Sequence, residues 1–246
     1  MSTSVLPKVV APPGAPKAFY TEVLDTLKRS GAPFMIGGAY AMQLHAGVVR
    51  DTKDLDVFCT AGDFPALLRA LGDAGFETEI TDDAWLGKAR HGDHFVDLIF
   101  SSANRSAPVD SVWLERAQRV NLFGRTVLVA SAEEVIWSKS TVQDRDRFDG
   151  ADVLHIIRRS GSQLDWRHLL DRMGANWEVL LAHIVMFRFV YPSDRDVIPA
   201  WLMQELLGRV GDQMALPTPQ DRICRGPLLS RTQYELDVEE WGYTYK

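Results

Sequence analysis

Hydrophobic positions in the first third of the chain follow helical and strand spacing in turn. Residues 18–30 carry apolar side chains at intervals of three and four, which predicts an amphipathic helix. Residues 34–36 form a short apolar run that stops at a pair of glycines, as a strand followed by a turn does. Residues 39–45 suit a short helix. Residues 54–58 alternate acidic and apolar side chains, and this pattern predicts a second strand.

The same alternation of helices and strands continues to about residue 130. A helix is expected to begin at Asp63 as its N-cap and to end before Gly75, with its apolar stripe facing the core. The other expected elements are a strand at 76–81, a hairpin of 88–91 with 95–101 around a turn at 91–94, a short helix at 109–117, and a hairpin of 119–122 with 125–129.

From residue 131 onward the spacing is helical. Ser131 and Glu134 form a capping-box pattern, which marks the start of a helix. Further apolar stripes predict helices at 132–143, 149–159, 169–173, 177–189 and 197–210. The chain therefore divides into a Pro-rich, flexible lead-in at 1–17, an α/β domain at 18–130, and a helical C-terminal domain with its tail at 131–246. The expected fold is a small mixed sheet flanked by helices, followed by this helical domain.

Composition changes this picture little. The chain has 246 residues, 46% hydrophobic and 24% charged, which is ordinary for a globular protein. Its net charge of −6 argues against a dedicated duplex-DNA binder, so nucleic acid is a possible partner but not the favoured one. Cys59 and Cys224 have no metal-binding spacing and fit a reducing cytoplasm. The apolar run at 179–191 is too short to span a membrane and contains His183 and Arg188, so it predicts a buried helix.

Acidic residues at alternate strand positions are the first sign of chemistry. Asp54 and Asp56 lie on one face of their strand, roughly 7 Å apart, and repel each other unless a cation lies between them. Oxygen ligands of this kind suit a divalent cation. Asp97, in the strand at 95–101, is an acid among apolar neighbours with no basic residue close in sequence. A buried unpaired carboxylate is costly, so a metal ion or a cation from elsewhere is expected beside it.

The glycine pair indicates what such a cation would serve. Backbone N–H groups at the start of a helix favour anions, and Gly37 and Gly38 allow a phosphate to approach the backbone closely. A phosphate cradle beside paired carboxylates is typical of metal-assisted phosphoryl or nucleotidyl transfer.

These motifs together resemble the signature of the DNA polymerase β-like nucleotidyltransferase superfamily. That signature is a Gly-Ser or Gly-Gly turn opening a helix, an Asp-x-Asp on the next strand, and a later strand carboxylate. Here the matching residues are Gly37-Gly38, Asp54-Leu55-Asp56 and Asp97. The link at 50–56 is most similar to the antibiotic (aminoglycoside or lincosamide) and the toxin or abortive-infection branches. Gly-Gly in place of Gly-Ser removes a hydroxyl, so a phosphate contact must rest on backbone and basic residues.

The resemblance implies further site residues and ligands. Asp54, Asp56 and Asp97 would hold two divalent ions, expected to be Mg²⁺, and act in catalysis. Gly37, Gly38, Arg50 and Lys139 would contact the nucleoside triphosphate, with ATP the favoured donor. The nucleotide would lie between the two domains. Its nucleoside monophosphate would pass to an unidentified hydroxyl acceptor, a small molecule in the favoured interpretation. A spacing of arginine, aspartate and aspartate that ties the two domains together in the superfamily is matched by Arg145, Asp149 and Asp152.

Two alternatives stay open from the sequence. A toxin-type enzyme would act on tRNA or a protein, although the only local basic cluster is modest. A non-catalytic nucleotide-binding or partner-binding module would use the same scaffold. A zinc site at His91, His94 and Asp97 is disfavoured because their three-residue rhythm suits a helix, whereas this region is expected to be a hairpin. The oligomeric state, the acceptor and the base preference are not predicted.

Overall fold

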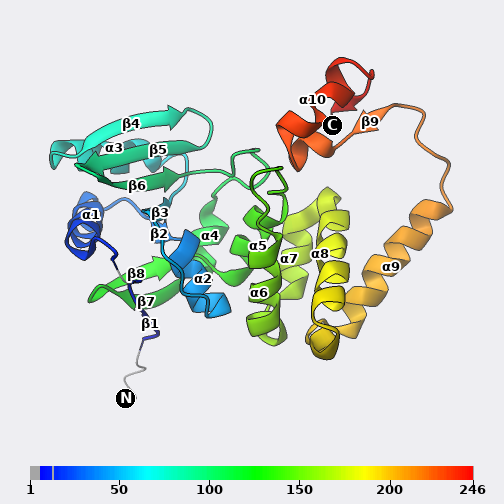
Figure 1. Ribbon diagram of the computed structural model, residues 1–246, viewed down its shortest axis with the longest axis horizontal. Helices are drawn as coiled ribbons and strands as arrows, with labels where there is room; N and C mark the ends of the chain where they lie inside the picture. The colour runs from blue at the N-terminus through cyan, green and yellow to red at the C-terminus, as the bar shows by residue number, and fades with distance from the viewer. Residues whose placement is uncertain (1–5, 13, 246) are drawn as a thin grey trace. The chain divides into compact units, whose positions relative to one another are not determined.

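The computed structural model describes residues 6–12 and 14–245, which form two compact units that divide between Ser131 and Ala132. The first unit is built on an eight-stranded mixed sheet with the strand order β1-β7-β8-β2-β3-β6-β5-β4. The second unit is mostly helical. The α/β architecture predicted from the sequence, a mixed sheet flanked by helices and followed by helices, is confirmed (Figure 1).

The sheet contains both strand orientations. β3 pairs in parallel with β6 and antiparallel with β2, and β2 pairs in parallel with β8. The outer strands β6, β5 and β4 form an antiparallel meander at one edge, visible in Figure 1. The strands are β1 (Lys8–Val9), β2 (Met35–Ile36), β3 (Asp54–Phe58), β4 (Glu77–Asp82), β5 (Leu86–His91), β6 (His94–Ile99), β7 (Gln118–Leu122) and β8 (Arg125–Val129).

Four helices complete the first unit. They are α1 (Lys17–Ser30), α2 (Gly38–Ala46), α3 (Phe64–Asp73) and α4 (Ser111–Arg116). α1 ends at Gly31, which adopts φ 75°, a conformation that favours glycine. α3 packs against α1, β4 and β5 through buried apolar side chains, including Leu67 and Leu71. Asp63 is the N-cap of α3 by position, but its carboxylate accepts a hydrogen bond from the Thr60 hydroxyl and makes no cap bond to the helix.

Part of the expected lead-in is ordered. Lys8 and Val9 form β1, which pairs in parallel with β7, and Val9 is only 3% exposed. The Val10 amide donates to the side-chain oxygen of Gln43 on α2, which anchors the end of this strand. The expectation of a flexible lead-in is therefore wrong for Lys8–Val9, because burial of Val9 and backbone pairing with β7 order this strand. Residues 1–5 and 13 lie outside the described part of the chain.

The second unit packs a group of helices around a common core. In Figure 1, α5 (Ala132–Ser140), α6 (Gly150–Ser160), α7 (Trp166–Met173) and α8 (Trp177–Val190) lie side by side. Glu134 is fully buried, and it accepts hydrogen bonds from Arg172 and lies 2.6 Å from Nε2 of His168, which joins α5 to α7. The unit also contains α9 (Ala200–Met214), α10 (Arg231–Glu239), β9 (Ile223–Cys224), β10 (Thr244–Tyr245) and the 3₁₀ turns at Gly161–Gln163, Gly174–Asn176, Pro192–Val197 and Gly226–Leu228.

One stretch in this unit, Trp166–Val190, is long and apolar enough to cross a membrane by length and composition alone. In the structure it consists of α7 and α8 joined by the turn at Gly174–Asn176. His183 in α8 is 1% exposed and bonds to the carbonyl of Ser140 on α5, so this face of α8 packs inside the helical unit. Length and composition are weak evidence, and packing of this kind is typical of a core helix.

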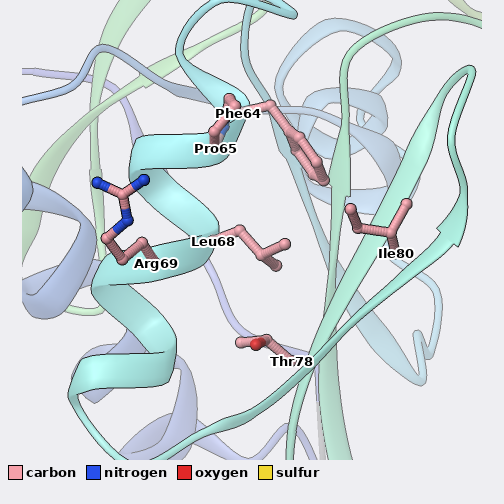
Figure 2. Close-up of a pocket in the computed structure, with 6 residues that line it drawn as sticks. All are labelled: Phe64, Pro65, Leu68, Arg69, Thr78 and Ile80. Atoms are coloured by element: carbon pink, nitrogen blue, oxygen red, sulfur yellow. The ribbon is translucent and has the colours of Figure 1, made fainter.

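A shallow apolar pocket lies on the first unit between α3 and β4 (Figure 2). Leu68 extends from the helix toward Ile80 on the strand, and Phe64 and Thr78 line the same space. None of the acids singled out from the sequence lines this pocket.

Candidate active site

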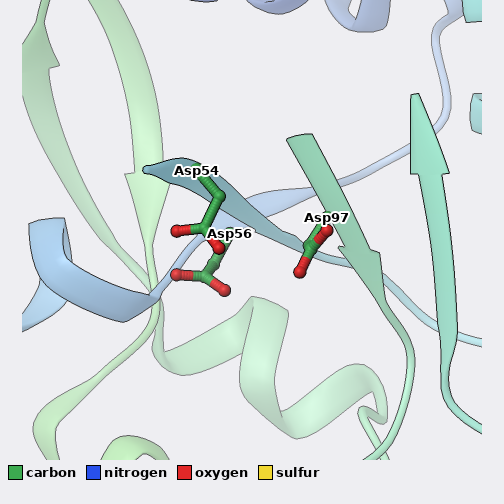
Figure 3. Close-up of side chains that lie close together, drawn as sticks. All are labelled: Asp54, Asp56 and Asp97. Atoms are coloured by element: carbon green, nitrogen blue, oxygen red, sulfur yellow. The ribbon is translucent and has the colours of Figure 1, made fainter. Parts of the chain in front are cut away.

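The structure brings Asp54, Asp56 and Asp97 together on adjacent strands. β3 and β6 run parallel in a register that places Asp56 directly beside Asp97. One carboxylate oxygen from each acid lies within 4.8 Å of the other two. Figure 3 shows the carboxylates of Asp54 and Asp56 leaving their strand on the same side, with Asp97 beside them on the neighbouring strand.

The alternation of side chains along both strands explains this placement. The residues between the acids, Leu55 and Val57 on β3 and Val96 and Leu98 on β6, are fully buried. Because successive side chains point to opposite faces, burial of these four turns the acids to the other face of the sheet. A shift of one residue in either strand would bury a carboxylate, so the hydrophobic pattern itself specifies the register.

The glycine pair is required by close contacts with β3. A Cβ atom built on Gly38 would lie 1.6 Å from Oδ2 of Asp56, and Gly38 has φ 49°. A Cβ atom on Gly37 would lie 2.2 Å from the ring of Phe58, which stacks on Trp113 with ring centroids 5.4 Å apart. The Gly37 amide donates to the Asp56 carbonyl at 3.0 Å. The start of α2 therefore lies directly against the Asp56 carboxylate, where helix amides favour negative charge.

The polar surroundings of Asp54 come from three elements. The Thr52 hydroxyl donates to Oδ1 of Asp54 at 2.8 Å and precedes β3 in the chain. Tyr20 on α1 and Tyr40 on α2 are buried, and their hydroxyls have no hydrogen-bond partner in the part of the chain that the structure describes. Burial, together with the negative charges of Asp54 and Asp56, raises the pKa of Tyr20 to about 12. Burial also raises the pKa of Tyr40, with smaller contributions from Tyr20 and from the two aspartates.

Asp97 has a cation beside it, as its sequence context led us to expect, but the sequence analysis did not identify which residue supplies it. Lys88 on β5 places its Nζ 2.6 Å from Oδ1 of Asp97, and the two side chains are only 17% and 13% exposed. Lys88 is therefore the cation from elsewhere in the chain that was expected beside Asp97, because strand pairing sets residue 88 opposite residue 97. Burial raises the pKa of Asp97 above its ordinary value, Lys88 partly offsets this effect, and Asp54 adds to it.

The donor set fits a divalent cation. Three carboxylates supply oxygen ligands, which Mg²⁺ and Ca²⁺ prefer, and their spacing allows one ion to contact all three. The Asp56 carboxylate occupies the space where a side chain at position 38 would lie, so only glycine fits at that position of α2. These acids can therefore hold a metal ion beside the start of a helix, where a phosphate is favoured.

Two further residues, Arg50 and Lys139, were expected to contact the nucleotide. Arg50 is exposed in the loop between α2 and β3. Lys139 belongs to α5 of the second unit, where its Nζ lies 2.7 Å from Oδ2 of Asp149 and 2.9 Å from Oδ2 of Asp152. Burial raises the pKa of Asp149, but Lys139 and Arg147 outweigh burial and lower it overall. Lys139 thus ties α5 to the start of α6.

The mixed sheet, the three clustered strand carboxylates and the glycine turn that opens a helix agree with the nucleotidyltransferase signature that the sequence resembles. The sequence profile of the aminoglycoside-2''-adenylyltransferase family matches residues 20–152, which is more than half of the chain and includes the three acids. The chain therefore belongs to this family, and it is a nucleotidyltransferase. The resemblance drawn from the sequence to this superfamily and to its antibiotic-modifying branch is confirmed. Among curated proteins, no sequence matches the chain.

Several solved structures resemble the chain at low identity. The solution structure of the antibiotic-resistance factor ANT(2'')-Ia is 19% identical, with 72% of this chain and 93% of that chain covered and a TM-score of 0.41. Lincomycin-bound lincosamide adenylyltransferase LnuA is 16% identical, with 61% and 98% covered and a TM-score of 0.41. A nucleotidyltransferase-like protein from Paracoccidioides brasiliensis is 17% identical, with 74% and 92% covered and a TM-score of 0.43. Because all three TM-scores are below 0.5, the family membership rests on the sequence profile.

Proposed function

We propose that this protein transfers a nucleoside monophosphate from a nucleoside triphosphate, with ATP as the favoured donor, to a hydroxyl group of a small molecule, releases pyrophosphate as the leaving group, and depends on Mg²⁺ for this reaction. The observation that supports the proposal most strongly is the meeting of three carboxylates in front of a glycine turn. Family membership supports the transfer chemistry. The cytoplasm, where nucleoside triphosphates are plentiful, is the expected location.

Each residue of the site has a role in this proposal. Asp54, Asp56 and Asp97 would hold the metal, which when bound stabilises the charge that develops on the phosphates. Gly37 and Gly38 let the triphosphate approach the amides at the start of α2. Asp97 is also the proposed general base for the acceptor hydroxyl, because burial raises its pKa toward the range that a base needs.

Two basic residues are proposed to contact the triphosphate. Arg50 is exposed and lies four residues before Asp54 in the chain, and it is proposed as one of these contacts because its guanidinium can bind a phosphate. Lys139 is proposed as a second phosphate contact, and this role requires it to exchange at least one of its two aspartate partners for the nucleotide. Binding of the triphosphate would then loosen the tie between α5 and α6.

The acceptor is proposed to be a small hydroxyl-bearing molecule that carries positive charge. The chain has a net charge of −6, which would attract a cationic acceptor more strongly than an anionic one. A polycationic aminoglycoside meets this description, and aminoglycoside-modifying activity is what the family's name describes.

Replacing Asp56 tests the transfer reaction. Asp56→Asn keeps the volume of the side chain but removes a negatively charged ligand, so we expect transfer from α-labelled ATP to fall by more than about 100-fold. The fold should stay intact, as far-ultraviolet circular dichroism would show. Asp93→Asn, in the exposed turn between β5 and β6, is the matched control and should keep wild-type activity. Undiminished transfer by the Asp56 variant would reject the proposed site.

A substrate panel separates the possible acceptors. Purified protein is incubated with Mg²⁺, labelled ATP and, in separate reactions, an aminoglycoside, a lincosamide, total tRNA or cell protein. Label on an antibiotic supports the small-molecule acceptor, whereas label on tRNA or protein favours a toxin-type enzyme. Binding of ATP without transfer to any acceptor would favour a nucleotide-binding module.

A further inference from the structure

Lys88 lies beside the acids and is bound to one of them. Its ammonium contacts Oδ1 of Asp97 at 2.6 Å and lies 4.6 Å from the centre of the Phe95 ring. Its side chain is 17% exposed, which is low for a lysine on the surface of a sheet. The cation therefore has two partners, a carboxylate and an aromatic face, and both favour this position of the ammonium.

The strand register places Lys88 outside the space enclosed by the acids. Asp56 on β3, Asp97 on β6 and Lys88 on β5 occupy successive positions across the sheet, so Lys88 flanks Asp97 on the side away from Asp56. The order of these strands can be followed in Figure 1. The lysine consequently binds one oxygen of Asp97 without standing between the three acids.

The next cation along β5 provides a contrast. Arg90 lies on the same face of β5, two residues from Lys88, but its guanidinium pairs with Glu79 on β4 at 2.7 Å. Both of these side chains are about half exposed. Arg90 therefore belongs to a solvated ion pair at the edge of the sheet, whereas Lys88 is bound to a member of the acid cluster.

Lys88 changes the charge that a metal ion meets. Three ionised carboxylates and one ammonium carry a formal charge of −2 together, so a single divalent ion neutralises the group. A second divalent ion then gains little electrostatic attraction until an anionic triphosphate adds negative charge. Without Lys88 the three acids would carry −3, and they would remain attractive to a second ion.

We propose that Lys88 is a positioning residue that holds Oδ1 of Asp97 and makes binding of a second divalent ion depend on the triphosphate. Because Lys88 binds Oδ1 of Asp97, the other carboxylate oxygen, Oδ2, is left for the metal ion. The ammonium also keeps a positive charge next to Asp97. The inference rests on the proposed function, because it takes the three acids to be the metal site. It adds to that function a residue that makes the second metal ion bind only together with the triphosphate.

Metal binding without nucleotide tests this inference. Titrations of the full chain with Mn²⁺ at pH 7.5, followed by the electron paramagnetic resonance signal of free Mn²⁺, give the number and affinity of bound ions. We expect one Asp56-dependent ion on the wild type. Lys88→Met should bind its first ion about tenfold more tightly, equivalent to about 1.4 kcal/mol, or bind a second ion. Addition of a non-hydrolysable ATP analogue should bring a second ion to the wild type.

Matched variants isolate the charge from the fold. Lys88→Arg keeps the positive charge and should bind Mn²⁺ as the wild type does. Lys88→Gln is a second neutral variant and should behave as Lys88→Met does. Arg90→Met removes the neighbouring cation from the same strand and should change Mn²⁺ binding much less than Lys88→Met does, because Arg90 acts on Asp97 only through its charge and not through a direct contact. Thermal melting of each protein shows that the comparison is made between folded chains.

The outcomes separate the two proposals. If Asp56 is needed for Mn²⁺ binding but both neutral variants at position 88 bind one ion with wild-type affinity, the role of Lys88 is overturned and the metal site stands. The same role is overturned if Arg90→Met tightens binding as much as Lys88→Met does. If the wild type binds no Mn²⁺, or binds it equally well after Asp56→Asn, the metal site of the proposed function fails.

Discussion

Gly38 shows how one residue identity decides the geometry of the site. Its φ of 49° lies in the left-handed region, and its α-carbon is packed so closely on Asp56 that a Cβ atom would overlap Oδ2. The overlap would involve the far end of a flexible side chain, so it is relieved most cheaply by moving the carboxylate. A side chain at this position would therefore affect metal binding more than it affects the fold.

Gly38→Ala is expected to disable the site at a modest cost in stability. Left-handed strain costs about 1–2 kcal/mol, and relief of the overlap displaces the Asp56 carboxylate. Mn²⁺ binding and nucleotide transfer should both be lost in a protein that still melts cooperatively. Gly47→Ala is the matched control, because Gly47 has φ 69° with nothing within 4 Å of its Cβ position. Retention of Mn²⁺ binding by the Gly38 variant would contradict this explanation.

At the scale of single residues, the sequence pattern predicted the acids and glycines of the site but not the other residues around them. Asp54, Asp56 and the glycine pair were visible because alternation and turn chemistry act between near neighbours. Lys88 was missed although the predicted hairpin contained the signal, since a two-residue turn between His91 and His94 sets residue 88 opposite residue 97. Tyr20 could not be found, because α1 meets the site only through tertiary packing.

At the scale of elements, periodicity located helices and strands better than it located their partners. The hairpin of β7 with β8 was predicted with both strands within one residue of their observed bounds, because a short turn at Gly124 fixes it locally. The pairing of β2 with β8 joins segments far apart in sequence, and no local pattern encodes it. β1 was missed because two residues carry no periodic signal.

The contact between α8 and α5 predicts a loss of stability in acid. Nε2 of His183 donates to the Ser140 carbonyl at 2.8 Å, and burial lowers the pKa of this histidine below its ordinary 6.5. The folded state thus favours neutral His183. Its stabilising contribution is complete above pH 6.5 and declines as the pH falls from there toward the lowered pKa, because the unfolded chain takes up a proton first.

Urea unfolding between pH 7.5 and 5 measures this effect. The wild type should lose at most about 1.4 kcal/mol of unfolding free energy per pH unit below 6.5 from this one group. His183→Gln can still donate to Ser140 but cannot titrate, so its loss over the same range should be smaller. His91→Gln changes an exposed histidine and should follow the wild type. Parallel curves for the wild type and His183→Gln would rule the mechanism out.

At the scale of the whole molecule, the proposed ligands are divided between two units. The three acids and the glycine turn belong to the first unit, and Lys139 belongs to the second. The change from mixed to helical spacing near residue 130 was visible in the sequence. The placement of one unit against the other depends on contacts that no periodicity encodes, so a nucleotide held by both units stays a prediction.

Joint binding of metal and nucleotide should therefore stabilise the chain more than either ligand does alone. A triphosphate is repelled by the acids and by the net charge of −6, and a bound divalent ion removes the nearest part of that repulsion. Each ligand then raises the affinity for the other, and the coupling is reciprocal. A ligand at 100 times its Kd stabilises the folded state by about 2.7 kcal/mol.

Thermal melting with Mg²⁺, with a non-hydrolysable ATP analogue, and with both measures this coupling. The increase in Tm with both ligands should be larger than the sum of the two separate increases. Asp56→Asn should lose this excess, whereas Asp93→Asn should keep it, and a merely additive increase in the wild type would mean that metal and nucleotide do not share a site.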